Sequence, residues 1–192
     1  MADEIRVKGL YVGPEGCHTS IPVSKIEVAP DGIIGDRHRG MYKFVGAQES
    51  HIAPKGSYIP NFRQITIVSQ EELAEIALLL EINRVEPEAL SANIKLWGIP
   101  NFTGITKTGD WYLRFRSHRD NEVGAILRLM GENRPCVVAG ANLEDLHPEL
   151  PGLKSAWVKP ALGKRGQVAI VYRPGIIREQ SIIELVPHQP GL

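Results

Sequence analysis

Short segments in which apolar and polar residues alternate recur along almost the whole chain, and this pattern limits the possible folds more than any other feature. Such alternation predicts strands at residues 5–12, 22–28, 63–68, 111–116, 125–130, 168–172 and 182–186. Turn-forming residues, including 19 Gly and 14 Pro, separate these segments. Many short strands beside few helices predict a mainly β fold, a closed or nearly closed barrel with a few peripheral helices.

The clearest exception to the strand pattern follows residues 63–68. Ser69 can cap the N-terminus of a helix, and Glu72, three residues later, completes the sequence pattern of a capping box. Apolar residues then recur at helical spacing, namely Leu73, Ile76, Ala77 and Leu80. We therefore expect a helix from residue 70 to about residue 80, packed outside the barrel.

Two stretches lack a clear period. Residues 41–61 are interrupted by Gly46, Pro54, Gly56 and Pro60. They are expected to form a long loop, which in a compact domain usually has a function. Residues 142–166 are rich in Pro and Gly and should contain about one helical turn.

Length and composition limit the class of protein. A chain of 192 residues fits one domain, 1–192, and 43% hydrophobic residues are enough for a real core. The 22 basic and 22 acidic side chains balance, which argues against a nucleic-acid-binding protein with a broad basic face but allows a local basic pocket. The apolar runs fall short of the roughly 18 residues that cross a bilayer, so no membrane association is expected.

Cysteine usage indicates the cellular setting. The two cysteines, Cys17 and Cys136, are too few for a disulfide scaffold, and no His or Cys lies near them at the spacing of a structural zinc site. The first residues include acids and no apolar segment typical of a secretory signal. We expect a reducing, cytoplasmic setting in which both thiols are free.

Cys136 is the strongest single candidate for chemistry. It follows Pro135 just past a predicted strand, and Arg134 lies two residues before it. A cationic neighbour favours the reactive thiolate, which is also the soft ligand that molybdenum or copper binds. The alternative is a buried cysteine that acts as a small hydrophobic residue, which is the more common case. Cys17 lacks a comparable arginine neighbour, and we assign it the ordinary role.

The glycine-bracketed loop at residues 35–40 holds four polar side chains, those of Asp36, Arg37, His38 and Arg39. Glycine permits close approach of the backbone to a ligand, and arginine offers a planar fork for phosphate or carboxylate. The equally good alternative is a solvated polar turn in which the Asp36 side chain bonds its own backbone.

Three further polar residues are weaker candidates. Asn93 could bind the edge of a pterin-like ring through its paired donor and acceptor, although a helix C-cap is the more common role. Arg63 opens a predicted strand, and Arg165 lies in a basic turn before another. Each arginine alone is usually a solvated charge, but together with Arg37 they could form an anion pocket on a chain without net charge.

The order of these segments resembles that of the MOSC family, named after the C-terminal domain of molybdenum cofactor sulfurase. The similar segments are GIIGDRH at 32–38, RQITI at 63–67 ahead of the capped helix, ANI at 92–94 with Gly98, Gly109, PC at 135–136, and LGKRG at 162–166. They lie within residues 5–187, nearly the whole chain. No single segment is specific, and the ordered set carries the resemblance.

The resemblance implies a β-barrel with peripheral helices and a site for molybdenum cofactor (molybdopterin). In family members of the amidoxime-reducing type, the cysteine that corresponds to Cys136 ligates the metal. The segments expected to bind the cofactor contain Asp36, Arg37, His38, Arg63, Asn93 and Arg165. Two departures from the family pattern are Ala92, where an acidic residue is usual, and the stretch 41–61, which is longer than in compact relatives.

Three functions remain open at this point. The first is a molybdenum-dependent reductase of N-hydroxylated or N-oxygenated small molecules, supplied with electrons by redox partner proteins. The second is a sulfur carrier that holds a persulfide on Cys136, with a desulfurase as its partner. The third is a non-catalytic module that binds or delivers molybdenum cofactor. The chain is too short to include the pyridoxal-phosphate-dependent desulfurase domain of the larger sulfurases, so no pyridoxal phosphate is expected in it.

Overall fold

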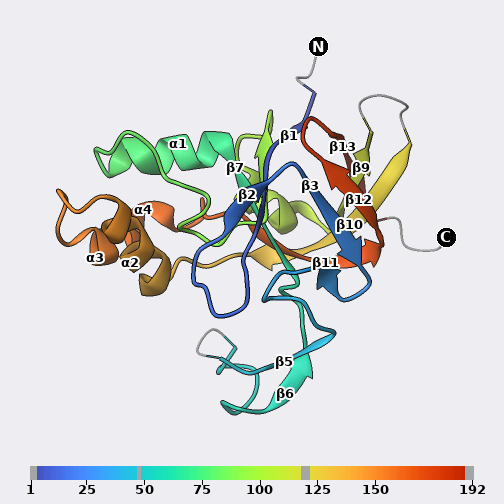
Figure 1. The fold of residues 1–192 in the computed structure, drawn as a ribbon, viewed down its shortest axis with the longest axis horizontal. Coiled ribbons are helices and arrows are strands. Elements are labelled where there is room, and N and C mark those ends of the chain that lie inside the picture. The colour runs from blue at the N-terminus through green and yellow to red at the C-terminus, as the bar shows by residue number, and fades with distance from the viewer. Residues whose placement is uncertain (1–3, 47–48, 118–121, 189–192) are drawn as a thin grey trace.

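The main sheet organises the molecule. A computed structural model describes residues 4–46, 49–117 and 122–188. The strands of this sheet are β1 (Arg6–Val12), β2 (Ile21–Val23), β7 (Ile65–Ser69), β8 (Ile94–Trp97), β9 (Trp111–Arg116), β10 (Val123–Glu132), β11 (Gln167–Arg173) and β13 (Ile182–Pro187). They are hydrogen-bonded in the order β13-β9-β10-β11-β7-β8-β1-β2, and a further pairing of β13 with β1 closes seven of them into a barrel (Figure 1). The predicted closed barrel is therefore confirmed.

The barrel interior is filled by residues that alternate along the strands. Five completely buried side chains come from five different strands, namely Val7, Leu96, Leu113, Leu127 and Ala169. Burial of a large apolar side chain contributes roughly 1.5–3 kcal/mol, and a shift of one residue would turn each of these side chains outward. The core therefore fixes the register of the strands.

A smaller sheet covers part of the barrel. It consists of β12 (Gly175–Arg178), β3 (Lys25–Ala29) and β4 (Gly32–Ile33), in that order. Its buried residues Ile26, Val28, Ile33 and Ile177 belong to the same core as the barrel. The prediction of one strand over 22–28, and of none between 172 and 182, was wrong. The chain changes sheets next to Ser24, a change that alternation along the sequence does not reveal.

A helical layer packs outside the barrel on one side (Figure 1). It contains α1 (Gln70–Leu79), α2 (Val137–Leu146), α3 (Leu153–Ala156) and α4 (Val158–Ala161), while a 3-10 helix, η1 (Phe102–Thr108), lies between β8 and β9. Leu73, Ile76, Leu143 and Trp157 form the centre of this second core. None of the helices among the described residues is long and apolar enough to span a membrane.

Helix α1 confirms the sequence prediction, since the Ser69 side chain accepts a hydrogen bond from the Glu72 backbone N–H. The expectation of about one helical turn in 142–166 was wrong, because the end of α2 lies in this stretch and α3 and α4 follow it. Packing of α2 against α3 depends on Gly140, which lies just before this stretch. A Cβ atom at this position would lie 2.3 Å from the Lys154 carbonyl oxygen, so this glycine permits close helix packing. Glycine content alone does not distinguish such a contact from a loop.

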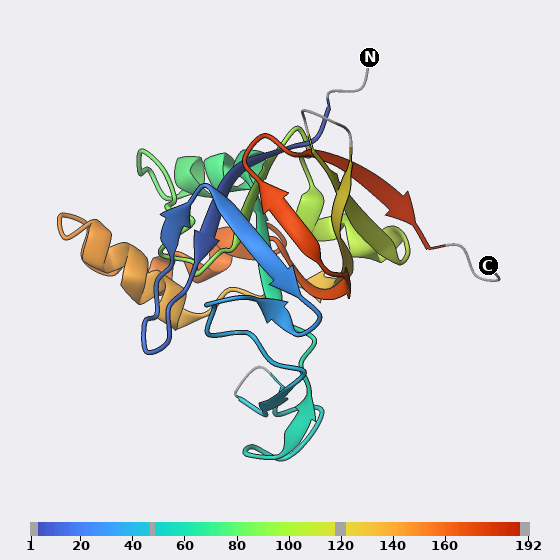
Figure 2. The same ribbon diagram turned by 45° about the vertical axis from the view of Figure 1, so that its right-hand side comes forward.

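The stretch 41–61 also differs from its prediction. It is not wholly a loop, because β5 (Tyr42–Phe44) and β6 (Tyr58–Pro60) pair as an antiparallel hairpin. Figure 2 shows this hairpin standing away from the barrel. Strands of three residues are too short for alternation to identify them.

Candidate functional site

A polar pocket lies where the loop after β4, the start of β7, the end of β10 and the start of α2 meet. Its volume is about 120 Å³. Its walls include five of the seven predicted site residues, Arg37, His38, Arg63, Cys136 and Arg165. The other two, Asp36 and Asn93, are buried and do not line the pocket.

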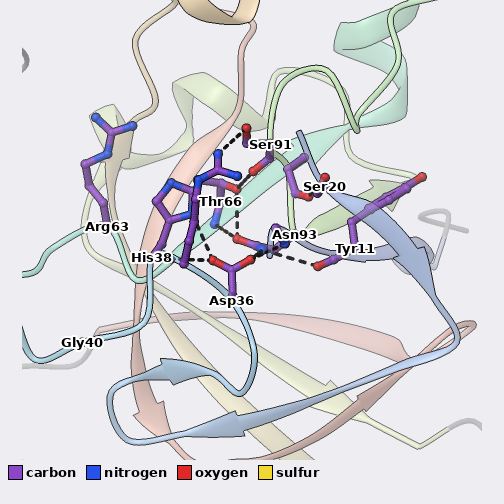
Figure 3. Close-up of polar contacts among 12 residues, drawn as sticks. Tyr11, Ser20, Asp36, His38, Gly40, Arg63, Thr66, Ser91 and Asn93 are labelled. Carbon is purple, nitrogen blue, oxygen red and sulfur yellow. Dashed lines mark hydrogen bonds and ion pairs between the residues drawn. The ribbon is translucent and has the colours of Figure 1, made fainter. Parts of the chain in front are cut away.

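Asp36 and Asn93 form a buried network behind the pocket (Figure 3). The Asp36 carboxylate accepts hydrogen bonds from the Gly13 backbone N–H at 2.7 Å, from the His38 backbone N–H at 2.8 Å and from Asn93 Nδ2 at 2.7 Å. Asn93 Oδ1 accepts from the backbone N–H of Thr66 at 2.9 Å and from its hydroxyl at 3.0 Å. Because these groups bond within the protein, the network braces the loop at 35–40. Asn93 precedes β8, so the alternative role as a helix C-cap does not apply.

The same network orients a histidine. Burial disfavours ionisation of Asp36, but hydrogen bonds from the His38 ring and from backbone N–H groups outweigh it, so the pKa of Asp36 lies below its ordinary value. Asp36 Oδ1 lies 3.0 Å from His38 Nδ1. Because an ionised carboxylate can only accept, Nδ1 carries the hydrogen. The Nε2 atom is left without a hydrogen-bond partner among the described residues, on a ring that lines the pocket.

Arg37 connects the network to the pocket. Its guanidinium donates to the carbonyl oxygens of Thr19 and His18, at 3.3 and 3.4 Å, and to the Ser91 hydroxyl at 2.6 Å. The side chain also lines the pocket. Arg37 therefore both holds neighbouring loops together and presents positive charge to a ligand.

Arg165 has far fewer partners, although it is only 5% exposed. Its Nη2 donates to the Leu90 carbonyl oxygen at 3.0 Å, while Nε and Nη1 are buried and bond no described residue. Burial lowers the pKa of Arg165 to about 10, an effect that Cys136 opposes and Arg63 reinforces. The side chain is therefore still a cation at neutral pH.

The turn that carries Arg165 depends on the next residue. Gly166 has a φ of +92°, and a Cβ atom there would lie 2.0 Å from the Ile67 carbonyl oxygen. The Asn133 backbone N–H also donates to the Gly166 carbonyl oxygen at 2.9 Å. Only glycine allows so close an approach to β7, and this approach fixes where the Arg165 side chain enters the pocket.

Arg63 lies at the outer side of the pocket. Its Nη2 donates to Asn133 Oδ1 at 3.0 Å, and its Nη1 is 3.7 Å from Glu49 Oε1. Burial lowers the pKa of Arg63, and electrostatic interactions with Glu49 and Cys136 oppose this effect. Glu49 lies on the segment that joins β5 and β6, so the hairpin is linked by charge to the pocket.

Cys136 caps the N-terminus of α2 and is half-buried. Its carbonyl oxygen accepts from Trp157 Nε1 at 2.9 Å, which anchors the residue to the helical core. Arg134, the cation that the sequence indicated, is exposed. The cations that interact electrostatically with the thiol are Arg63 and Arg165, which folding brings from distant parts of the chain.

Comparison with known proteins identifies the family. The MOSC domain model matches residues 46–184. The chain belongs to the MOSC domain family. A Bacillus subtilis protein named "Putative metal-sulfur cluster biosynthesis proteins YuaD" is 39% identical to this MOSC protein over 184 residues, which cover 96% of this chain and 91% of the relative.

Solved structures agree with this assignment. The crystal structure of YuaD from Bacillus subtilis has a TM-score of 0.88 to this MOSC protein at 37% identity, covering 97% of this chain and 98% of that one. The crystal structure of YiiM from Geobacillus stearothermophilus has a TM-score of 0.59 at 16% identity, covering 97% and 77%. The second likeness shows a shared fold alone.

Some residues of the pocket were not predicted from the sequence. Asn133 orients Arg63, and Asn142 on α2 donates to the carbonyl oxygens of His18 and Ala89, at 3.0 and 2.9 Å. No local pattern singles out these amides, because each lies alone among unrelated neighbours.

The chemistry available to this MOSC protein follows from the charges. Three guanidinium groups line the pocket together with the Cys136 thiol at the N-terminus of α2, an arrangement that favours an anionic ligand. Both cysteines are free thiols. Within the described ranges, no group of three or more His, Cys, Asp or Glu side chains gathers as a candidate metal site.

Proposed function

We propose that this MOSC protein binds molybdenum cofactor in the arginine pocket and reduces N-hydroxylated compounds there. The observation that carries the proposal is Arg165, a buried cation whose Nε and Nη1 atoms donate no hydrogen bond to any described residue. A buried donor left unpaired costs about 1–3 kcal/mol, and more if it is charged. The phosphate of the cofactor is an anion that would satisfy both donors.

The residues present fit this cofactor. Arg37, Arg63 and Arg165 would hold its phosphate, because arginine binds phosphate through paired hydrogen bonds. Cys136 would ligate molybdenum through its sulfur. When bound, the cofactor would supply the two-electron redox chemistry that amino-acid side chains lack. Asn93 is omitted from this ligand set because its amide bonds within the protein.

The net reaction also needs protons. An N-hydroxylated compound R–NHOH takes up two electrons and two protons, the N–O bond breaks, and R–NH₂ and water leave. A redox partner protein would supply the electrons. With both ring nitrogens protonated, His38 would deliver a proton from Nε2 to the leaving oxygen, because Asp36 accepts the hydrogen bond from Nδ1.

Substitution of Arg165 by Met tests the proposal. The variant and wild-type protein are produced in a host that makes the cofactor, and molybdenum, pterin and melting temperature are measured side by side. Hydrogen bonds to charged groups are worth roughly 1.5–3 kcal/mol, so cofactor affinity should fall by at least ten-fold.

Arg128→Met is the matched control. Arg128 also has a buried Nε without a partner among the described residues, but it lies outside the pocket and pairs with Asp110. The Arg128→Met variant should keep the cofactor. Full molybdenum content in Arg165→Met would refute the proposed site.

A sulfur carrier is the second candidate, favoured by the name of the YuaD relative and by the half-buried thiol at the pocket. The outer sulfur of a donor persulfide would move to the Cys136 thiolate, and the donor would leave as a thiol, without net oxidation. Incubation of cofactor-free protein with a desulfurase and cysteine, followed by peptide mass spectrometry, separates the candidates. A gain of one sulfur atom at Cys136 without molybdenum would support the carrier.

A further inference from the structure

We infer that the β5–β6 hairpin is the wall that binds the flat aromatic ring of a substrate in front of Cys136. The inference deepens the proposed reductase function and rests on it for the identity of the reacting group. The stacking surface itself depends on the hairpin and on the cleft beside it, and not on the reaction.

The cleft extends from the arginine pocket to the hairpin. It has a volume of about 560 Å³ and shares Cys136 and Arg63 with the pocket, while Tyr42 and Phe44 line its other side. Small-molecule sites usually enclose roughly 300–1,000 Å³. A ligand in this cleft would therefore reach Cys136 while it touches the hairpin.

Aromatic side chains make up the wall. Tyr42 and Phe44 are two residues apart on β5 and so share a face of the hairpin. They are 54% and 68% exposed, which is unusual for large rings. Tyr58 on β6 supports both, with ring centroids 5.3 Å from Tyr42 and 5.2 Å from Phe44. Because Phe44 and Tyr58 are direct partners across the hairpin, the three rings lie side by side on one face, and Tyr42 and Phe44 line the cleft.

The charges of the cleft limit the ring that can bind. Four basic side chains line it, those of Arg37, Arg39, Lys43 and Arg63, against the single acid Glu49. Glu49 accepts a hydrogen bond from Lys43 Nζ at 2.8 Å, so part of the positive charge is compensated within the hairpin. The excess positive charge disfavours cationic rings. The ligand class is therefore a neutral or anionic planar ring that carries the N-hydroxylated group.

Two matched probes test this wall, benzohydroxamic acid and acetohydroxamic acid. They carry the same hydroxamate, and a phenyl ring in one replaces a methyl group in the other. Isothermal titration gives their affinities without any turnover, and contacts of the hydroxamate cancel in the ratio. The wild-type protein should bind the phenyl probe more tightly.

The variants are Tyr42→Ala, Phe44→Ala and the double variant. Stacking on one aromatic side chain is worth about 1–3 kcal/mol, so the double variant should lose about ten-fold to a hundred-fold in the ratio of affinities. Affinity for the methyl probe should not change. Tyr42→Phe, which keeps the ring, should retain the wild-type ratio.

Ile52→Ala is the control within the same segment, because Ile52 is 65% exposed and does not line the cleft. An equal ratio in wild-type protein and double variant would overturn the inference. So would a loss of molybdenum and pterin in the double variant, because the wall would then hold the cofactor. Slower electron transfer with an unchanged ratio would also overturn it, in favour of a protein-docking surface.

These results separate the inference from the proposed function. If the ratio responds to the hairpin variants while the wild-type protein binds no molybdenum, the stacking wall stands and the reductase fails. If Arg165→Met loses the cofactor while the hairpin variants keep the ratio, the cofactor site stands and the wall fails.

Discussion

The Asp36–Asn93 network and the pocket around Arg165 are neighbouring buried polar regions, and they differ in how fully their hydrogen bonds are satisfied. The Asp36 and Asn93 side chains bond backbone and side-chain groups of the protein on every side. Arg165, in contrast, keeps two buried donors unpaired among the described residues. Because a buried polar group is costly unless it is bonded, the first region supports structure, and the second is the region that we propose as the ligand site. Burial and polarity alone do not distinguish these roles.

The largest expected effect would follow from breaking the satisfied region. Asp36→Ala removes the acceptor of the Gly13 and His38 backbone N–H groups and of the Asn93 amide. Each orphaned donor costs about 1–3 kcal/mol, so the free energy of unfolding should fall by roughly 3–5 kcal/mol in urea titrations.

Arg165→Met in cofactor-free protein is the matched comparison. Its free energy of unfolding should stay constant or rise, because an apolar side chain replaces an unpaired buried cation. If Asp36→Ala and Arg165→Met destabilise the protein equally, the distinction between the two regions is wrong.

Glu72 extends the comparison to a half-satisfied group in the helical layer. Among the described residues, its carboxylate accepts hydrogen bonds from Thr103 alone, from the backbone N–H at 2.8 Å and from the hydroxyl at 2.7 Å. Burial raises its pKa from 4.5 to about 7, although both hydrogen bonds from Thr103 oppose the shift. Between these pH values the folded protein holds a proton that the unfolded chain has lost.

The free energy of unfolding should therefore fall as pH rises from 4.5 to about 7, by at most about 3 kcal/mol. Glu72→Gln should remove most of this slope, as measured by urea unfolding at a series of pH values. Asp36 has the opposite sign, since its lowered pKa gives stability that is lost as pH falls toward the acid range. An unchanged slope in Glu72→Gln would assign the pH dependence to other groups.

Arg37 shares features of both regions, so its substitution should moderately reduce both cofactor retention and the free energy of unfolding. Arg37→Ala should weaken cofactor retention about ten-fold, because it removes charge-assisted hydrogen bonds to the phosphate. It should also lower the free energy of unfolding by about 1 kcal/mol through the lost contacts with Thr19 and Ser91. Arg37→Lys should recover retention only in part, since an ammonium group lacks the planar fork. Full retention in Arg37→Ala would place this residue wholly in the structural region.

The smallest effect concerns the two thiols. The rate ratio of alkylation by anionic iodoacetate to that by neutral iodoacetamide should be several-fold higher at Cys136 than at Cys17. Two arginines, Arg63 and Arg165, attract the anion to Cys136, whereas Arg37 alone interacts with Cys17 among the described arginines. Peptide mass spectrometry gives both rates, and salt should reduce the difference. Equal ratios at the two cysteines would mean that the pocket does not concentrate anions.

Much of the barrel could be predicted because strand alternation is a local signal. Residues 111–116 were predicted as a strand and form β9, and Ser69 was predicted as the cap of α1. The hairpin at 42–60 was not predicted because its strands are too short for alternation to identify them. The list of candidate site residues could also be drawn up from residue types and their order along the chain. The sequence could not show which of these residues brace the loop at 35–40 and which line the pocket.

The sequence by itself determined which residues alternate, where the first helix begins, and that Cys136 and several arginines are available for chemistry. Only the tertiary structure decided that Asp36 meets Asn93 across 57 positions of the chain, and that Arg165 reaches Cys136 without a carboxylate partner among the described residues. The physical reason is the separation along the chain of the residues that interact. Alternation and capping depend on neighbours within a few residues, whereas hydrogen-bond satisfaction depends on which distant groups the closed barrel brings together.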